Sequence, residues 1–295
     1  MHVPVLLKET IDGLDLVEGD IYLDVTLGSG GHMQEVWQRM KGKVLLFGID
    51  ADETSLLIAE EKLNLLGATI KSLQLNFRNI DKVPEIFGIS PTKILFDLGW
   101  STDQFEEGER GFSFQKDEPL LMTFKNKVGE EDTTAYDVVN KWKEENLADV
   151  IYGYGEERYA RRIAKAIVER REVKPIETSL ELAEIIKNAV PVFHRFGRLH
   201  PATKTFQAIR IAVNDELEAL TEGLTKGFEI LQSGGRMVVI SFHSLEDRIV
   251  KNFYKLKEAE DKCEIINKKP LTPSEEEIKI NPKSRSAKLR ILRKK

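Results

Sequence analysis

The chain has 295 residues and a mass of 33.6 kDa, with 41% hydrophobic and 32% charged residues and a formal net charge of −5. This length predicts one large domain or two smaller ones with a substantial core. No apolar run approaches the roughly 20 residues that span a bilayer, and the first residues lack a signal-peptide pattern. The single cysteine, Cys263, excludes an internal disulfide and a cysteine-built zinc site, so we expect a cytoplasmic protein.

The most informative segment is Asp24–His32, which reads Asp-Val-Thr-Leu-Gly-Ser-Gly-Gly-His. It follows the apolar run Ile21–Leu23 and precedes a helical pattern over Met33–Met40, so it predicts a strand, a glycine-rich turn and a helix. Glycines let the backbone approach a ligand closely, and the N-terminus of a helix attracts negative charge. The alternative is an ordinary strand-to-helix turn that binds nothing.

A second apolar strand, Val44–Asp50, ends in a carboxylate. An acidic residue at this point, about 20 residues past a glycine turn, is where the ribose hydroxyls of a nucleotide are held. Met33 stands where a dinucleotide site needs its third glycine. Asp24 would repel a pyrophosphate but suits a ligand with a positive amino group. The pattern therefore favours S-adenosylmethionine over a dinucleotide.

Strands and helices alternate through the first hundred residues. The expected strands are Ile21–Asp24, Val44–Asp50, Ile70–Leu75 and Ile94–Leu98, and the expected helices are Met33–Met40, Thr54–Leu66 and Asn79–Phe87. Such alternation predicts an α/β, Rossmann-like fold with a mostly parallel sheet covered by helices on both faces. Ligands bind beyond the carboxyl ends of such strands, where Thr26–His32, Asp50, Phe77 and Asp97 fall, so we expect one shared site.

The pattern changes after Asp97, where residues 104–202 contain no clear strand. Helices are expected at Thr134–Lys143, Leu147–Ile151, Arg158–Arg170 and Leu180–Val190. The α/β pattern then resumes with a long helix, a strand, a helix that starts at a capping box, and two last strands. These elements are expected at Thr205–Leu231, Arg236–Ser241, Ser244–Leu256, Cys263–Ile266 and Leu289–Leu292. We therefore predict a discontinuous sheet domain of residues 1–103 and 203–295 with an inserted helical domain of residues 104–202.

Two strand ends carry candidate catalytic groups. In enzymes that methylate exocyclic amines of bases, a carboxylate after the fourth strand accepts hydrogen bonds from the amine and a nearby aromatic ring stacks on the base, which makes Asp97 and Trp100 candidates. His243, after the fifth strand, is a third. The alternatives are that Asp97 caps a loop, Trp100 fills the core and His243 is a structural donor. No cluster has a convincing metal spacing, so no metal is predicted.

Basic residues are concentrated in two segments. Residues 281–295 contain seven Lys and Arg and no acid, and residues 194–210 contain four with two histidines and no acid. The helix expected at Arg158–Arg170 adds a basic face. Such patches can contact phosphates on a protein that is acidic overall, which indicates a nucleic-acid partner. The alternative is a solvated surface.

Taken together, the motifs resemble one family, the bacterial 16S ribosomal RNA cytosine-N4-methyltransferases that act on cytosine 1402 of the decoding centre. The matching segments run nearly end to end: His2–Glu9, Gly30-Gly31-His32, Gly48-Ile49-Asp50, Asp97-Leu98-Gly99, Glu109–Phe114, Tyr154–Arg158, His200–Arg210, Ile240–Arg248 and Asn281–Ser286. So many long matches in order are far more specific than a lone glycine motif.

The resemblance implies an S-adenosylmethionine-dependent enzyme whose inserted domain binds the substrate, which is 16S rRNA in the assembled small ribosomal subunit. It implies these cofactor contacts: Gly30, Gly31, His32, Asp50, Phe77, Asp97 and Gln104. The chain departs from the family at Leu121 and Thr123, where an acid and an arginine are usual, and at Trp100, where valine is usual. These departures would alter rate or substrate preference.

Three alternatives stay open at this point: an S-adenosylmethionine-binding ribosome-assembly factor with little or no turnover, a DNA amine methyltransferase and, more distantly, a nicotinamide dehydrogenase. The usual Asn/Asp-Pro-Pro-Tyr segment of the DNA enzymes is absent after the fourth strand, and the glycine spacing is wrong for a dinucleotide. The sequence is compatible with a monomer or a homodimer.

Overall fold

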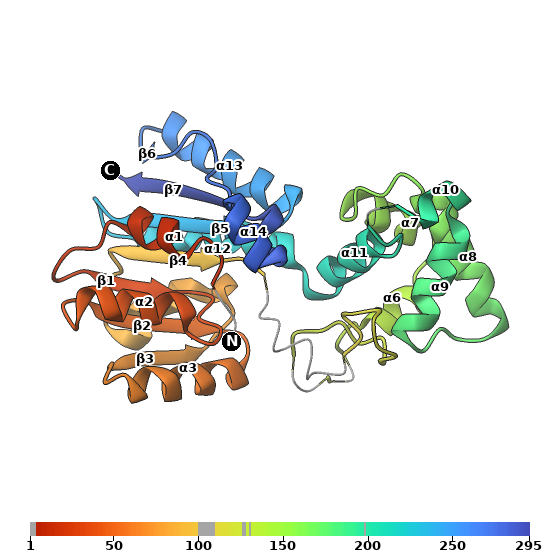
Figure 1. Cartoon of the computed structure of the whole chain (residues 1–295), viewed down its shortest axis with the longest axis horizontal. Helices are drawn as coiled ribbons and strands as arrows, with labels where there is room; N and C mark the ends of the chain where they lie inside the picture. Colours follow the sequence, from red (N-terminus) through yellow and green to blue (C-terminus); the bar gives the residue numbers. More distant parts are fainter. Residues whose placement is uncertain (1–3, 100–109, 126–127, 130, 198) are drawn as a thin grey trace. The chain divides into compact units, whose positions relative to one another are not determined.

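The computed structural model of the chain describes residues 4–99, 110–125, 128–129, 131–197 and 199–295 (Figure 1). The chain forms two compact units. The sheet unit consists of Met1–Ser101 and Leu217–Lys295, and the helical unit consists of Thr102–Glu216. The expected boundary after residue 202 differs from this division by one helix, α11 (Thr203–Asn214), which belongs to the helical unit.

The sheet unit is built on seven strands in the order β3-β2-β1-β4-β5-β7-β6. Their bounds are β1 Ile21–Asp24, β2 Leu45–Asp50, β3 Ile70–Gln74, β4 Lys93–Asp97, β5 Arg236–Ser241, β6 Cys263–Ile265 and β7 Lys288–Lys294. The pairs among β1 to β5 are all parallel, whereas β7 runs antiparallel to both β5 and β6. The prediction of a mostly parallel, Rossmann-like sheet is confirmed.

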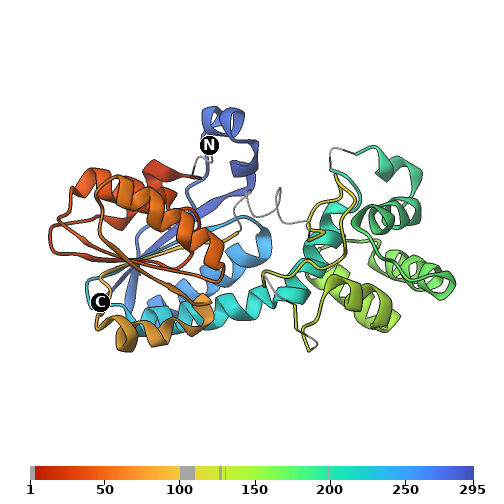
Figure 2. The same cartoon turned by 90° about the horizontal axis from the view of Figure 1, so that it is seen from below.

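Helices cover both faces of this sheet (Figure 2). The elements are α1 Leu7–Leu14, α2 Gly31–Met40, α3 Glu53–Leu65, the short 3₁₀ helix η1 Phe77–Lys82, α4 Val83–Phe87, α12 Glu216–Ile230, α13 Ser244–Ala259, α14 Glu275–Ile280 and the 3₁₀ helix η2 Pro282–Ser286. One face packs on α1, α2 and α3, and the other packs on α4, α12 and α13. Successive residues of a strand point to opposite faces, so Tyr22 joins the first core and Leu23 the second.

The prediction of one long helix over Thr205–Leu231 is wrong in one respect, because this segment forms two helices. Asp215 separates α11 from α12 and has a φ of 50°, in the left-handed region. Short polar residues such as aspartate tolerate this region better than other non-glycine residues, so the chain can break here without a glycine. The prediction also missed the short helices α1 and α14.

A buried ion pair ties α13 to the antiparallel strand β7. Asp247 accepts hydrogen bonds from Arg290 Nε at 2.6 Å and from Lys288 Nζ at 3.1 Å. Burial opposes the charged carboxylate, but these two partners outweigh it and hold the pKa of Asp247 below its usual value. The pair therefore fixes the C-terminal end of the sheet unit to the helix that follows β5.

We expect Asp247→Ala to lower the free energy of unfolding by about 3–5 kcal/mol, because it leaves the guanidinium of Arg290 buried without its partner. Glu18→Ala, which removes an exposed pair with Lys43 in the same unit, serves as the control and costs at most about 1 kcal/mol. Urea-induced unfolding measures both. Equal effects of the two substitutions would show that the buried pair contributes no more than a surface pair.

The helical unit contains α6 Ala135–Lys141, α7 Glu144–Gly153, α8 Ala160–Val173, α9 Ser179–Ala189, α10 Val192–Arg195 and α11. Its own core is formed by side chains from α6, α7, α8, α9 and α11, among them Val138, Ile151, Ile163, Ile186 and Ile209. In the part of the chain that the structure describes, no helix is both long enough and apolar enough to cross a bilayer.

Candidate active site

The candidate site lies at the carboxyl edge of the parallel strands in the sheet unit. β1, β2 and β4 each end in an aspartate, namely Asp24, Asp50 and Asp97. β1 is central and pairs with both β2 and β4, so the parallel register brings the three strand ends to one edge. Three carboxylates at one edge form a strongly negative region that suits a ligand with positive charge and hydroxyl donors.

The two glycines that end the turn after β1 are required for different physical reasons. Gly30, the N-cap of α2, has a φ of 79°, which a glycine adopts at no steric cost. A Cβ on Gly31 would instead lie 2.5 Å from Cγ of Pro4, so this glycine lets the N-terminal segment pack against the start of α2. The sequence interpretation assigned both glycines to ligand approach and did not anticipate the packing role of Gly31.

Asp50 closes the glycine turn from the neighbouring strand. Its Oδ2 accepts the Gly28 N–H at 2.8 Å and its Oδ1 accepts the Asp52 N–H at 2.9 Å. Burial raises the pKa of Asp50 despite these hydrogen bonds. Each carboxylate oxygen has two acceptor positions, so both oxygens retain capacity for a donor such as a ribose hydroxyl.

Asp97 meets the glycine turn through His32 and Thr26. The Asp97 N–H donates to Thr26 Oγ1 at 2.7 Å, which joins the ends of β1 and β4. His32 Nε2 lies 3.3 Å from Asp97 Oδ2, within ion-pair distance but without hydrogen-bond alignment. Asp97 Oδ1 and both His32 ring nitrogens are buried without a hydrogen-bond partner among the described residues. Buried polar atoms left unpaired are costly, and a bound ligand would supply the missing partners.

Asp24 lies beneath this site in a hydrogen-bond network that the sequence interpretation missed. The Tyr22 hydroxyl donates to Asp24 Oδ2 at 3.0 Å, and the Thr26 N–H donates to Oδ1 at 3.1 Å. Residues two apart on a strand share a face, which was the available signal for the contact between Tyr22 and Asp24. Burial outweighs the influence of His32 and these hydrogen bonds and raises the pKa of Asp24 to about 6.

The raised pKa of Asp24 predicts a specific pH dependence. Because the folded-state pKa of about 6 lies above the ordinary aspartate pKa of 3.8, the folded state binds more protons than the unfolded state between these limits. The free energy of unfolding therefore falls as the pH rises from about 4 to about 6, by about 3 kcal/mol from this group.

We expect Asp24→Asn to remove this decrease, since an amide does not titrate in the range. Urea-induced unfolding measured at several pH values tests it, with Asp12→Asn, at an exposed aspartate of the same unit, as the control. An unchanged slope between pH 4 and 6 in Asp24→Asn would contradict the assignment.

Phe77 begins η1, just past the carboxyl end of β3. Its ring packs edge-on against Phe96 with the centroids 5.8 Å apart, and a Cβ on Gly223 of α12 would lie 2.7 Å from its Cδ2. These contacts hold the ring at the strand edge while leaving it partly exposed. An adenine contact by Phe77 stays a prediction.

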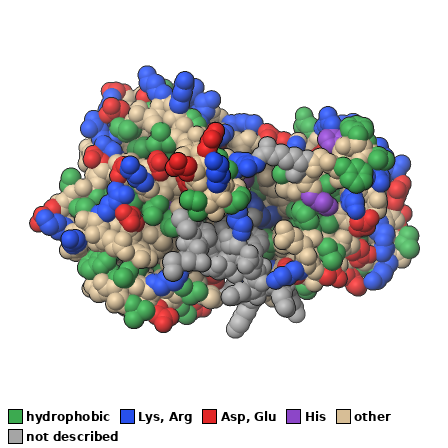
Figure 3. Space-filling view, viewed as in Figure 1, with side chains coloured by type: hydrophobic (Ala, Val, Ile, Leu, Met, Phe, Trp, Pro, Cys, Tyr) green, Lys and Arg blue, Asp and Glu red, His purple; other side chains and the backbone are tan. Residues whose placement is uncertain are grey.

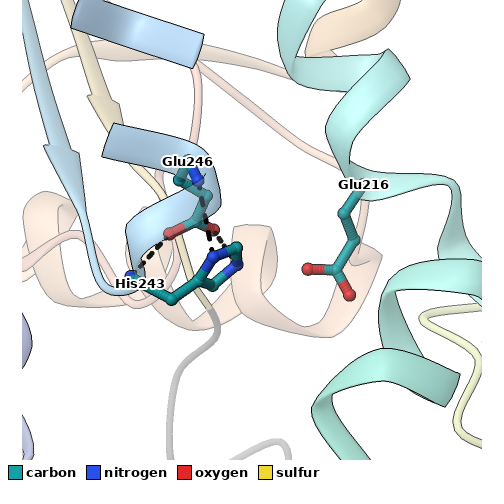
Figure 4. Close-up of side chains that lie close together, drawn as sticks. All are labelled: Glu216, His243 and Glu246. Atoms are coloured by element: carbon teal, nitrogen blue, oxygen red, sulfur yellow. Dashed lines mark hydrogen bonds and ion pairs between the residues drawn. The ribbon is translucent and has the colours of Figure 1, made fainter. Parts of the chain in front are cut away.

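His243 is the N-cap of α13, one residue before the predicted capping-box start at Ser244. Its Nδ1 accepts the Glu246 N–H at 3.4 Å, and Glu246 Oε2 accepts the His243 N–H at 3.2 Å (Figure 4). His243 therefore has a structural role at the helix start, and its catalytic role stays a prediction. Glu216, also drawn there, is the last residue of the helical unit.

Two predicted site residues, Trp100 and Gln104, lie outside the described residues. The unusual residues Leu121 and Thr123 lie within them and flank Met122, whose N–H donates to the Arg110 carbonyl at 2.7 Å. The Met122 carbonyl accepts from Asn214 Nδ2 at 2.7 Å. Two hydrogen bonds on main-chain groups of Met122, one of them from the Asn214 side chain, therefore hold this segment.

Comparison with known proteins covers the whole chain. The model of the MraW methylase family matches residues 1–295. The chain is 47% identical to the ribosomal RNA small subunit methyltransferase H of Persephonella marina, over 99% of both chains. It is 48% identical to the protein of the same name from Carboxydothermus hydrogenoformans, over 99% of this chain and 97% of that one.

Among solved structures, the chain is similar to a putative rRNA-methylase from Clostridium thermocellum at 14% identity, with a TM-score of 0.48 over the full length of both chains. The fold class rests on the observed strand order, and the family rests on the end-to-end sequence matches. The chain therefore belongs to the MraW methylase family, and S-adenosylmethionine is its methyl donor.

Proposed function

We propose that the chain transfers a methyl group from S-adenosylmethionine to the exocyclic N4 of a cytosine in the decoding centre of 16S rRNA, at cytosine 1402. The observation that carries the substrate is the similarity, over nearly the full length, to relatives named ribosomal RNA small subunit methyltransferase H. The two basic segments recognised in the sequence support an RNA substrate, because cationic surfaces bind phosphates.

The residues of the carboxyl edge fit the cofactor. Asp50 would accept the ribose hydroxyls with the acceptor capacity left on its two oxygens. Gly30, Gly31 and His32 would face the amino-acid portion, next to the negative region at the strand ends. Phe77 would pack on the adenine ring. When bound, S-adenosylmethionine supplies an electrophilic methyl group on a sulfonium.

Asp97 would orient the target amine. Its buried Oδ1 has no hydrogen-bond partner among the described residues and would accept an N–H of the cytosine amine. Its backbone is fixed by the hydrogen bond to Thr26, so the acceptor is positioned before the base arrives. A cytosine amine is a weak nucleophile, and alignment with the methyl group contributes most of the rate enhancement. The base must be unpaired or flipped to reach this position.

The substrate class is tested by incubating the protein with radiolabelled S-adenosylmethionine and, in parallel, small ribosomal subunits, naked 16S rRNA and DNA oligonucleotides. We expect label only in RNA. Incorporation into DNA alone would replace the proposal with a DNA amine methyltransferase, and no incorporation despite cofactor binding would show that the substrate is neither RNA nor DNA of these forms.

A further inference from the structure

The helical unit exposes several large apolar side chains around α10. Phe193 is 74% exposed, Phe196 is 81% exposed and Leu199 is 63% exposed. Figure 3 shows hydrophobic, histidine and basic side chains together at the upper right, over the region of α10. Clustered exposed apolar groups mark interaction sites more often than isolated ones do.

An arginine and three rings form a continuous series of contacts on this surface. The Arg158 guanidinium lies 4.8 Å from the ring centroid of Tyr159 and also donates to His194 Nε2. The His194 ring lies edge-on to Tyr159 at 4.9 Å and 5.2 Å from the ring of Phe193. The series links the start of α8 to α10 and presents exposed π faces beside a cation.

The first turn of α8 adds two more cations. Arg161 and Arg162 are exposed, and neither makes a hydrogen bond or ion pair with any residue that the structure describes. Arg158 lies in the turn just before the N-cap Tyr159, so it adds a third cation next to this first turn. The first turn contains no acid. Cations at a helix N-terminus oppose the helix dipole, so this placement lowers stability and favours a bound anion.

We propose that this aromatic–arginine surface, formed by Arg158, Tyr159, Arg161, Arg162, Phe193, His194 and Phe196, binds single-stranded RNA. Bases stack on the exposed rings, and the arginines contact the phosphates. Charge complementarity selects RNA as the occupant, because exposed rings beside three arginines, of which Arg161 and Arg162 make no ion pair among the described residues, match alternating bases and phosphates. The inference deepens the proposed function, on which it rests, by assigning an RNA-holding surface to the helical unit.

The electrostatic part is tested with Arg161→Glu and its matched control Lys143→Glu, at the exposed N-cap of α7, which like Arg161 has no ion pair with any described residue. The probe is a fluorescein-labelled single-stranded RNA of the decoding-centre sequence, and the full-length protein is titrated by anisotropy. A glutamate in the first turn of α8 is favourable to the helix dipole, so weaker binding would not reflect a destabilised helix.

We expect Arg161→Glu to weaken RNA binding about 10-fold and to reduce the slope of log Kd against log salt by about 0.7. Lys143→Glu should change neither. An equal loss of affinity in both variants would show a non-specific effect of charge and would overturn the proposal.

The stacking part is tested with Phe193→Ala/Phe196→Ala and with Phe193→Leu/Phe196→Leu, which keeps the apolar area but removes the π faces. We expect each double variant to bind the RNA about 10-fold or more weakly. Normal binding by the leucine variant would exclude stacking. If the variants bind naked RNA normally but no longer bind small subunits, a ribosomal protein occupies the surface instead. If the variants have a lower mass in solution than the wild type, a second copy of the chain occupies it.

Methyl transfer and cofactor binding separate failure of this inference from failure of the proposed function. If the wild type methylates 16S rRNA and the variants bind RNA as it does, only the surface assignment is wrong. If the wild type binds the RNA but transfers no methyl group, and the variants lose RNA binding, the surface assignment is supported and the proposed reaction is wrong. Calorimetric binding of S-adenosylmethionine should be unchanged in all of these variants.

Discussion

We expect Asp97→Ala to lower kcat for methyl transfer by about 100- to 1,000-fold, the usual effect of removing a positioned polar group that acts on the reacting atoms. The unpartnered Oδ1 of Asp97 is the acceptor at the end of β4 that would orient the amine. The fold should persist, because the contact that joins β4 to β1 here is made by the Asp97 N–H, which alanine retains.

Transfer to small ribosomal subunits at saturating cofactor measures this prediction. Asp97→Asn is the matched variant, since its amide keeps an acceptor oxygen, and it should retain more activity than alanine. Circular dichroism and the melting temperature check the fold. A kcat for Asp97→Ala within about 3-fold of the wild type would remove Asp97 from the reaction.

The second large effect is expected at Asp50. Asp50→Ala removes both carboxylate oxygens that would accept the ribose hydroxyls, and each hydrogen bond to a charged group contributes about 1.5–3 kcal/mol. Affinity for S-adenosylmethionine should therefore fall by about 100-fold or more. The substitution also deletes the acceptors of the Gly28 and Asp52 N–H groups, so a lower melting temperature is expected as well.

Isothermal calorimetry with S-adenosylmethionine tests Asp50→Ala, and Glu53→Ala, at an exposed acid in the first turn of α3, is the control for charge. Asp50→Asn keeps the shape of the side chain and should bind with intermediate affinity. If Asp50→Ala is folded and binds as tightly as the wild type, the ribose assignment is wrong.

The parallel sheet could be predicted from the sequence because its signals are local. β1 and β5 begin and end at the expected residues, and β2 begins one residue later than expected. Apolar runs with an aspartate at or near their end indicate both a strand and its ligand edge, so the sequence alone places Asp24, Asp50 and Asp97 at this edge. The helices α6, α7, α8 and α9 of the helical unit are predicted from their 3.6-residue periodicity for the same reason, whereas the short helix α10 is not.

The features that escaped prediction depend on contacts between distant residues or on unusual backbone conformations. The need for glycine at position 31 comes from Pro4, which lies far from it in the sequence. The break between α11 and α12 at Asp215 depends on a left-handed backbone conformation that the local sequence pattern does not predict. His243 caps α13 in a role that serine or threonine usually fills, so the helix begins at Ser244 as expected but its capping residue is His243.

The exposed aromatic rings at α10 show a different limit of prediction from sequence, which concerns burial. Residues 194–210 were recognised as basic, but a sequence cannot show whether Phe193 and Phe196 are buried in a core or face solvent. Their exposure of 74% and 81% changes the interpretation of this segment from a charged patch to a surface with both π faces and cations. Burial is decided by tertiary packing, which composition alone does not specify.

The most direct test of the account is to incubate the protein with labelled S-adenosylmethionine and small ribosomal subunits that lack the modification, and then to identify and map the labelled nucleoside. We predict N4-methylcytidine at cytosine 1402 of 16S rRNA. A different methylated nucleoside, or N4-methylcytidine at another position, would contradict the proposed target, and an unlabelled subunit with intact cofactor binding would contradict the proposed substrate.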